Sequence, residues 1–185
     1  MDVVRGQRGL GMGGHHAPTR GAKDEWLTPP PIIEALGPFD LDPCAPVVRP
    51  WPTAARHLTI EDDGLTADWP ADAFVWCNPP YGPATWAWLD RMAEHPGGGI
   101  ALIFARTETA GFFRSVWRQP AVTALLFIQG RLHFHHVNGK RAAVNSGAPS
   151  VLVAFGAEAR RRLVAFREAG EFIDRPAAGT DGGAP

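Results

Sequence analysis

Four consecutive residues near the middle of the chain have the types and spacing for chemistry on a planar amino group: Asn78, Pro79, Pro80 and Tyr81. The Asn78 amide oxygen and the Pro79 carbonyl are two acceptors that can converge on one exocyclic NH2. Acceptors in the plane of an aromatic amine draw its lone pair out of ring conjugation and prepare it to attack an electrophile. The Tyr81 ring offers a flat face on which a base can stack.

The elements that must hold these residues are short strands and helices. The motif follows an apolar run over residues 74–77 that favours a buried strand, and the prolines end it because they have no N–H for a sheet ladder. A second polar turn, Asp42-Pro43-Cys44-Ala45, follows the strand predicted over residues 39–42. In open α/β sheets, ligands bind beyond the carboxyl ends of the strands, so both turns are expected at one edge.

The rest of the pattern indicates a doubly wound α/β domain. Helices are predicted over residues 28–36, 84–95 and 111–119, and further strands over residues 100–104, 122–128 and 150–155. Residues 131–135 alternate, Asn138-Gly139 is a hairpin turn signal, and residues 150–155 close the pattern, so a hairpin is predicted over residues 130–149. Strand–helix alternation followed by a hairpin predicts a mainly parallel sheet with an antiparallel C-terminal hairpin.

Composition and charge narrow the class of protein. The 185 residues are 45% hydrophobic and 20% charged, as in a globular domain, and no apolar run has membrane-spanning length. Two cysteines make no disulfide framework, which indicates a cytoplasmic location. The net charge is −8 over residues 23–95 and +7 over residues 97–162. A basic half suits a phosphate-binding face, although solvated surface charge alone gives the same pattern.

Five blocks, in this order, resemble the small phage-type DNA N6-adenine methyltransferases. They are Asp24–Pro30, Phe39–Ala45, Asp62–Leu65 with Trp69, Asn78–Tyr81 and Gly130–Phe134. The resemblance covers about residues 24–155. It implies the Rossmann-like fold of class I methyltransferases, S-adenosylmethionine as cofactor, and transfer of its methyl group to adenine N6 in DNA. It implies neither a metal nor an obligate protein partner.

The resemblance also implies roles for single residues. Thr28 matches the element that contacts the methionine carboxylate of the cofactor. Asp42 matches the residue that binds the methionine amino group, and Pro43, Cys44 and Ala45 line the same turn. Asp63 matches the acceptor for the cofactor's adenine amine, and Leu65 is expected along that ring. Asn78, Pro79, Pro80 and Tyr81 match the catalytic motif. In the basic half, Arg131, Lys140 and Arg141 are the expected phosphate contacts.

The predicted domain organisation is a flexible leader over residues 1–22, a methyltransferase domain over 23–157, a C-terminal helix over 158–170 and a disordered tail over 171–185.

Two features of the sequence depart from the family. The glycine-rich form of the first cofactor loop is absent, and the ribose-binding acid is unassigned, with Glu61 and Asp62 as candidates.

Other readings of the same residues remain open. Asp42 alone can be a helix cap, and Asp62-Asp63-Gly64 is most often a turn. Related motifs also occur in methyltransferases of protein glutamine and RNA guanine, and a non-catalytic nucleic-acid-binding relative is a third class. Cys44 follows a proline as in cytosine-C5 methyltransferases, but no Glu-Asn-Val segment accompanies it, which favours a small lining residue.

Overall fold

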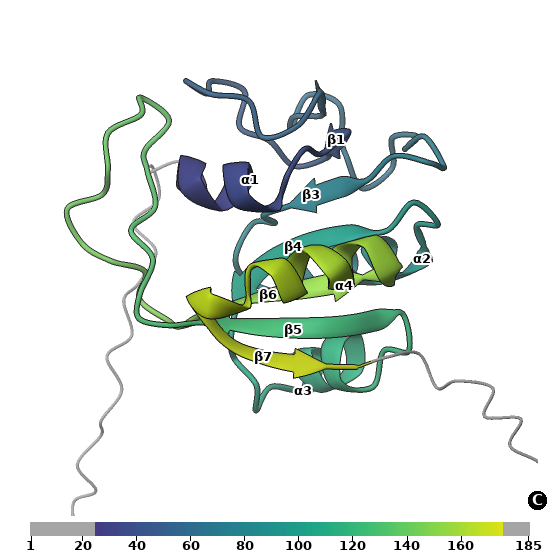
Figure 1. Ribbon diagram of the computed structural model, residues 1–185. Helices are drawn as coiled ribbons and strands as arrows, with labels where there is room; N and C mark the ends of the chain where they lie inside the picture. The colour runs from purple at the N-terminus through teal and green to yellow at the C-terminus, as the bar shows by residue number, and fades with distance from the viewer. Residues whose placement is uncertain (1–24, 176–185) are drawn as a thin grey trace, which may run out of the picture.

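The computed structural model describes residues 25–175. They form one seven-stranded sheet in the order β2-β1-β3-β4-β6-β5-β7 (Figure 1). The strands are β1 (Leu41–Asp42), β2 (Arg56–His57), β3 (Val75–Cys77), β4 (Gly99–Phe104), β5 (Val122–Ile128), β6 (Ser150–Phe155) and β7 (Gly170–Asp174). The leader predicted over residues 1–22 and the last ten residues of the predicted tail lie outside the described residues.

The α/β class is confirmed, and the sheet is mixed, with three parallel and three antiparallel strand pairs where a mainly parallel sheet was predicted. β1 pairs in parallel with β2 and β3, and β3 pairs in parallel with β4. The other three pairings, β4 with β6, β5 with β6 and β5 with β7, are antiparallel. The β5–β6 pair joins consecutive strands through residues 129–149, so the predicted antiparallel C-terminal pairing is present, with β5 and β6 as its two strands. β6 also pairs with β4 and so lies between β4 and β5, a long-range pairing that the sequence pattern does not show.

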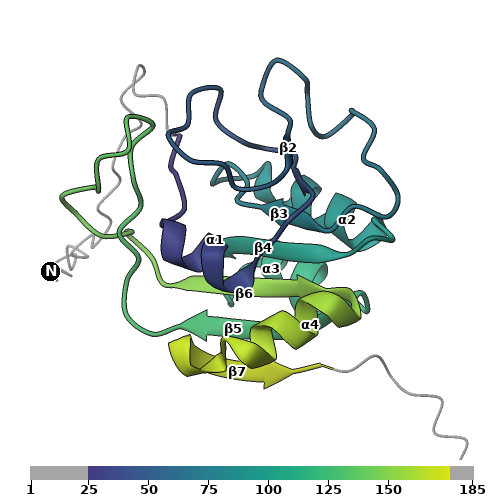
Figure 2. The ribbon, with the colours of Figure 1, turned by 45° about the horizontal axis from the view of Figure 1, so that its top comes forward.

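Residues 129–149, which we call the β5–β6 loop, leave the sheet altogether. The expected turn is present, since the Gly139 N–H donates to the His136 carbonyl at 2.8 Å. The flanking residues form isolated bridges and no named strand. Figure 2 shows the loop, in green, beside the segment that leads into α1.

Four α-helices cover the sheet: α1 (Pro30–Leu36), α2 (Thr85–Glu94), α3 (Ala110–Phe112) and α4 (Gly156–Ala165). The helix predicted over residues 111–119 is α-helical for one turn and continues as a π-helical turn over Phe113–Trp117. The C-terminal helix begins two residues earlier than predicted and is followed by a 3₁₀ turn at Arg167–Ala169.

The tail expected to be disordered from residue 171 is ordered as far as Arg175. Its first residues form β7, paired with β5 from Gly170 to Asp174. A bidentate ion pair joins Arg160 to Asp174, with both N–O distances 2.6 Å. The Arg175 guanidinium donates to the carbonyls of Val116 and Trp117. Pairing along a sheet edge orders a segment whose composition alone favours disorder.

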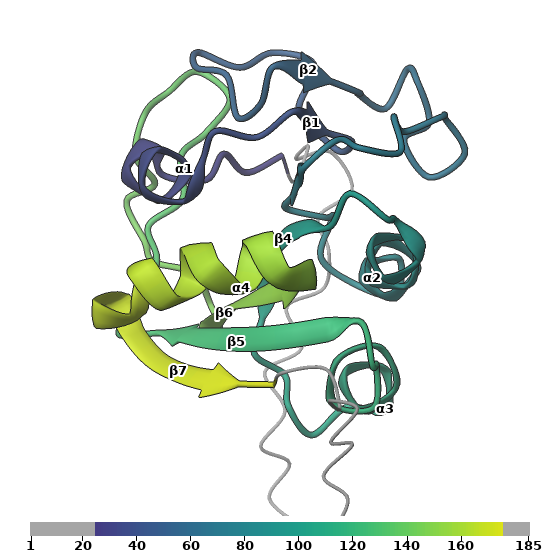
Figure 3. The same ribbon diagram turned by 45° about the vertical axis from the view of Figure 1, so that its right-hand side comes forward.

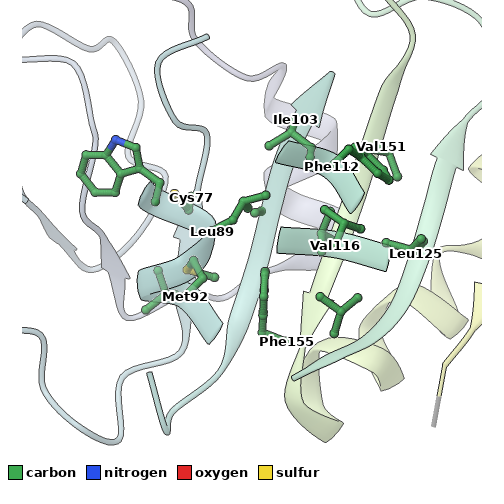
Figure 4. Packing of buried hydrophobic residues seen from close by; sticks show 14 of the residues in the cluster. Cys77, Leu89, Met92, Ile103, Phe112, Val116, Leu125, Val151 and Phe155 are labelled. Atoms are coloured by element: carbon green, nitrogen blue, oxygen red, sulfur yellow. The ribbon is translucent and has the colours of Figure 1, made fainter. Parts of the chain in front are cut away.

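Buried apolar residues lie on both faces of the sheet and fix its layers. On one face, α1 and α4 bury Leu36, Ala159 and Leu163 (Figure 3). On the other, α2 and α3 bury side chains such as Leu89 and Phe112 (Figure 4). β4 and β6 are buried almost throughout because helices cover both of their faces. This core leaves the carboxyl ends of β1, β3 and β4 to carry polar turns.

Candidate active site

Asp42 and Asn78 lie at the same edge of the sheet because β1 and β3 are neighbours in parallel register, with Leu41 opposite Val75. A cavity of about 230 Å³ opens at this edge. It is lined by Glu25, Trp26, Leu27, Thr28, Asp42, Pro43, Cys44, Ala45, Pro46, Thr53, Thr59, Ile60, Asp63, Gly64, Trp76, Asn78, Pro79, Pro80, Tyr81 and Trp88. The two turns that the sequence placed beyond strand ends therefore share one cavity.

Asp42 is one of the lining residues and is 3% exposed. Its carboxylate accepts hydrogen bonds from the Cys44 N–H at 3.1 Å and from the Thr53 hydroxyl. None of the ion pairs among residues 25–175 includes it. Burial raises the pKa of Asp42 to about 6, partly offset by these two hydrogen bonds. A buried carboxylate of this kind is suited to receive a cationic group from a ligand.

Asp63 reaches the same cavity from a separate turn. Its backbone is left-handed, with φ 49°, which Asp tolerates better than most residues, and its carboxylate accepts from the Thr66 hydroxyl at 2.9 Å. The next residue is glycine, and a Cβ at Gly64 would lie 1.8 Å from the Pro43 carbonyl oxygen. Only glycine lets the two turns approach so closely, so Gly64 brings Asp63 to the Asp42 turn.

Two buried hydrogen-bond donors among the lining residues have no partner within residues 25–175. They are the Thr28 hydroxyl and the Trp76 indole N–H, and the two residues are 2% and 0% exposed. An unpaired buried donor costs about 1–3 kcal/mol, so an acceptor that reached either group would be favoured. Thr28 was predicted as a ligand contact. No role was predicted for Trp76, because its position inside a buried strand suggests core packing.

Cys44 and Cys77 lie side by side beneath the cavity, with their sulfur atoms 3.7 Å apart, and both are free thiols. The hydrogen bond between them and their burial hold the pKa of Cys44 well above its ordinary value. A thiol of this kind stays protonated near neutral pH and is a poor nucleophile. The environment agrees with Cys44 as a small lining residue.

Asn78 is oriented by a hydrogen bond from outside its own strand. Its Nδ2 donates to the Trp26 carbonyl at 3.1 Å. Its Oδ1 accepts only a long hydrogen bond, 3.4 Å, from the Tyr81 hydroxyl. The Pro80 carbonyl accepts from the Thr85 hydroxyl at 2.8 Å, whereas no donor within residues 25–175 reaches the Pro79 carbonyl. Two acceptors, Asn78 Oδ1 and the Pro79 carbonyl, thus remain for a ligand.

The Tyr81 ring stacks on Phe104 at the end of β4, with centroids 3.9 Å apart and planes inclined by 6°. Phe134 of the β5–β6 loop meets the same ring edge-on, with centroids 6.1 Å apart. Burial raises the pKa of the Tyr81 hydroxyl far above its ordinary value, so the phenol is neutral. One face of the ring is covered, a feature the sequence did not indicate.

Some expected contacts lie elsewhere. Leu65 does not line the cavity; it packs against the core, and its carbonyl accepts from the Arg91 guanidinium. Glu61 and Asp62, considered for the ribose, are not lining residues either, and the Asp62 carboxylate accepts from the N–H and hydroxyl of Thr59. Ile60 is 84% exposed and lines the cavity instead. In the sequence, Ile60 is marked only as an apolar residue directly before the acidic turn at residues 61–63.

The three predicted phosphate contacts, Arg131, Lys140 and Arg141, are all exposed and lie on the β5–β6 loop. Lys140 and Arg141 directly follow the turn at Gly139, and Arg141 forms a bridge with His135. None of the three takes part in an ion pair within residues 25–175. The side chains are therefore available to a polyanion.

The family model described as DNA N-6-adenine-methyltransferase (Dam) matches residues 16–174. The chain belongs to this family. Membership implies DNA adenine N6-methyltransferase activity in general terms. Neither the curated proteins nor the solved structures gave a match to the chain. The family match confirms the resemblance inferred from the five sequence blocks.

The cavity fits the cofactor that a methyltransferase family implies. The buried Asp42 carboxylate suits the cationic amino group of an amino acid moiety, and the unpaired donors of Thr28 and Trp76 suit its carboxylate. In the described part of the chain there is no cluster of three metal-ligating side chains. No helix between residues 25 and 175 is long and apolar enough to span a bilayer.

Proposed function

We propose that the protein transfers a methyl group from S-adenosylmethionine to the N6 amino group of adenine in DNA. One observation carries the proposal: Asn78 Oδ1 and the Pro79 carbonyl, two acceptors without a strong donor, open into the same cavity as Asp42 and Asp63. A pair of acceptors for the target amine beside a cavity that holds the methyl donor is the arrangement that N-methylation requires.

The cofactor is bound by residues from three separate segments. Asp42 holds the methionine amino group, and Thr28 receives the methionine carboxylate. Pro43, Cys44 and Ala45 form the wall of the same turn, and Asp63 accepts from the adenine amine. S-adenosylmethionine supplies an electrophilic methyl group when bound. The residues that line this cavity would hold the bound cofactor at the edge of the sheet, where its methyl group would be supplied to the target amine.

The target amine is held by Asn78 and Pro79. Two acceptors in the plane of the NH2 group stabilise the positive charge that develops on the amine nitrogen during methyl transfer. Because this charge appears in the transition state, the acceptors lower the barrier more than they strengthen substrate binding. Tyr81 stacks on the base. The phenol is neutral, so it is a stacking and hydrogen-bonding group and not a base. No general base is needed before transfer, because the amine loses its proton afterwards.

DNA is held by the basic β5–β6 loop. Arg131, Lys140 and Arg141 contact phosphates, which positions the duplex without reading its sequence. A base inside a duplex cannot reach a cavity at the end of the strands. The target adenine must therefore be flipped out, at a cost of a few kcal/mol that stacking on Tyr81 partly offsets.

The proposal is tested by methyl incorporation from labelled S-adenosylmethionine into DNA, tRNA and ribosomal proteins in parallel. We expect label in DNA, recovered as N6-methyladenine after nuclease digestion. Asn78→Ala should reduce the single-turnover rate at least a hundredfold while cofactor affinity stays within twofold. Asp68→Ala is the matched control, since this exposed side chain takes no part in the cavity. Label in tRNA or protein instead of DNA would contradict the proposal.

A further inference from the structure

The catalytic amide is held by a segment remote in sequence. Asn78 Nδ2 donates to the carbonyl of Trp26, which lies 52 residues earlier in the chain. An asparagine amide group is planar, and its acceptor oxygen and its NH2 nitrogen point in different directions within that plane. The hydrogen bond to Trp26 therefore fixes which of these two atoms faces Tyr81. With the nitrogen anchored, the oxygen is the atom presented to a target amine.

The segment that carries Trp26 is itself held by the β5–β6 loop. The Leu27 N–H donates to the His135 carbonyl at 2.8 Å, and the His135 N–H donates to the Leu27 carbonyl at 3.0 Å. The Trp26 ring lies against the His136 ring, with centroids 5.0 Å apart. Leu27 is 1% exposed. Two backbone bonds and a ring contact thus join the loop to the residue that anchors Asn78.

The same loop carries the exposed cations. His135 also bridges to Arg141 across the turn at residues 136–139. Lys140 accepts at its carbonyl from the His136 N–H at 2.9 Å. Lys140 and Arg141 are thus joined through His136 and His135 to Leu27 by backbone contacts.

We propose that residues Trp26 and Leu27 form a positioning strap, through which the β5–β6 loop sets the orientation of the Asn78 amide. The inference rests on the proposed function, in that the loop engages DNA and Asn78 engages the amine. Phosphate contacts that order the loop then also hold the Trp26 carbonyl in place. When the loop is displaced, the Asn78 amide is free to rotate. Its NH2 group would then face the N–H donors of the target amine, where an acceptor is needed. Trp26 and His135 are positioning residues in this scheme.

His135→Pro tests the strap because proline removes the N–H that donates to Leu27. The matched control is Val137→Pro. Val137 is the second residue of the turn that the Gly139–His136 bond closes, a position that proline favours, and its N–H makes no backbone hydrogen bond within residues 25–175. At saturating DNA and cofactor, His135→Pro should lower the single-turnover rate about tenfold or more. Val137→Pro should stay within twofold of the wild type.

A double variant separates positioning from general damage. If the strap acts through the amide, His135→Pro should cost less than twofold in an Asn78→Ala background, because the group it positions is gone. The same tenfold loss in both backgrounds would overturn the proposal. Should His135→Pro fail to fold, Trp26→Ala replaces it, with rescue of the rate expected in Trp26→Phe, which keeps a ring against His136.

A second measurement does not depend on methyl transfer. The side-chain NH2 signals of Asn78 in ¹⁵N NMR, identified by their loss in Asn78→Ala, report the hydrogen bond to Trp26. We expect them to shift and exchange faster with solvent in His135→Pro and to be unchanged in Val137→Pro. Unchanged signals in His135→Pro would overturn the strap. If the wild type methylates no DNA but these signals respond, the proposed function fails while the strap stands.

Discussion

The ring of Tyr81 lies flat against the ring of Phe104, with centroids 3.9 Å apart and planes 6° apart. This separation leaves no room for a base between them, so a flipped base can stack only on the opposite face of Tyr81. Phe104 ends β4, where its backbone is paired with Ser150 of β6, and its ring is the backing for the Tyr81 ring. Stacking energy at the target base then depends on two rings from neighbouring strands.

The first prediction concerns this pair. Tyr81→Phe keeps the ring and should retain most of the fluorescence rise of 2-aminopurine at the target position on DNA binding. Tyr81→Ala should abolish the rise, since base stacking is worth about 1–3 kcal/mol per base. Phe104→Leu should give an intermediate rise, because Tyr81 loses its backing and not its ring. Equal fluorescence in all three variants would show that the base stacks elsewhere.

The second prediction concerns the pH dependence of cofactor binding. Asp42 must be ionised to hold an ammonium group, and its pKa in the free protein is raised to about 6. Below that pH, binding requires loss of a proton from Asp42. We expect the dissociation constant for S-adenosylmethionine to rise about tenfold from pH 7 to pH 5 in calorimetry. Asp42→Asn should bind weakly with no such trend. A flat profile in the wild type would place the ammonium group elsewhere.

The third prediction concerns stability without cofactor. The folded pKa of Asp42, about 6, lies above the ordinary value of 3.8, so the folded state binds the proton more tightly. The resulting stabilisation is complete below pH 3.8 and is lost as the pH rises through 6. Relative to Asp42→Asn, the wild type should lose about 2 kcal/mol of unfolding free energy between pH 4 and pH 7. Asp68→Asn, at an exposed site, should show no such difference in urea titrations.

The fourth prediction concerns the unpaired indole. If the Trp76 N–H meets the cofactor's carboxylate, Trp76→Phe should weaken S-adenosylmethionine about tenfold, as expected for a hydrogen bond to a charged group. The decarboxylated cofactor should bind Trp76→Phe and the wild type equally. Trp51→Phe is the matched control, because the Trp51 N–H is also buried without a partner within residues 25–175, but outside the cavity. An equal loss for both ligands in Trp76→Phe would point to packing.

The sequence predicted those parts of the site that depend on local pattern. Strand ends at Asp42 and Asn78 follow from apolar runs stopped by prolines, and parallel strands must bring such ends to one edge. It did not predict which strands are neighbours, since the insertion of β6 between β4 and β5 is a long-range choice. The sequence also gave no role to Trp76 or Trp26. The unpaired indole N–H of Trp76 and the Trp26 carbonyl that accepts from Asn78 are features that residue type does not reveal.

The fifth prediction concerns DNA. Lys140 and Arg141 are exposed beside the turn of the β5–β6 loop, at the end of the sheet where the cavity opens. Each phosphate contact contributes about one unit to the slope of log K against log salt. Replacing both residues by alanine should therefore lower the slope by about two, with cofactor affinity unchanged, because neither lines the cavity.

The matched control for that variant is replacement of Arg114 and Arg118. These cations are also exposed, and they lie before β5, at the end opposite the loop. They should leave the salt slope unchanged within about half a unit. An unchanged slope for the Lys140 and Arg141 variant would place the DNA elsewhere, and Arg160 and Arg161 would then be the next pair to replace. A reduced slope with an unchanged methylation rate at saturating DNA would show that these two cations hold the duplex and leave the chemistry to Asn78.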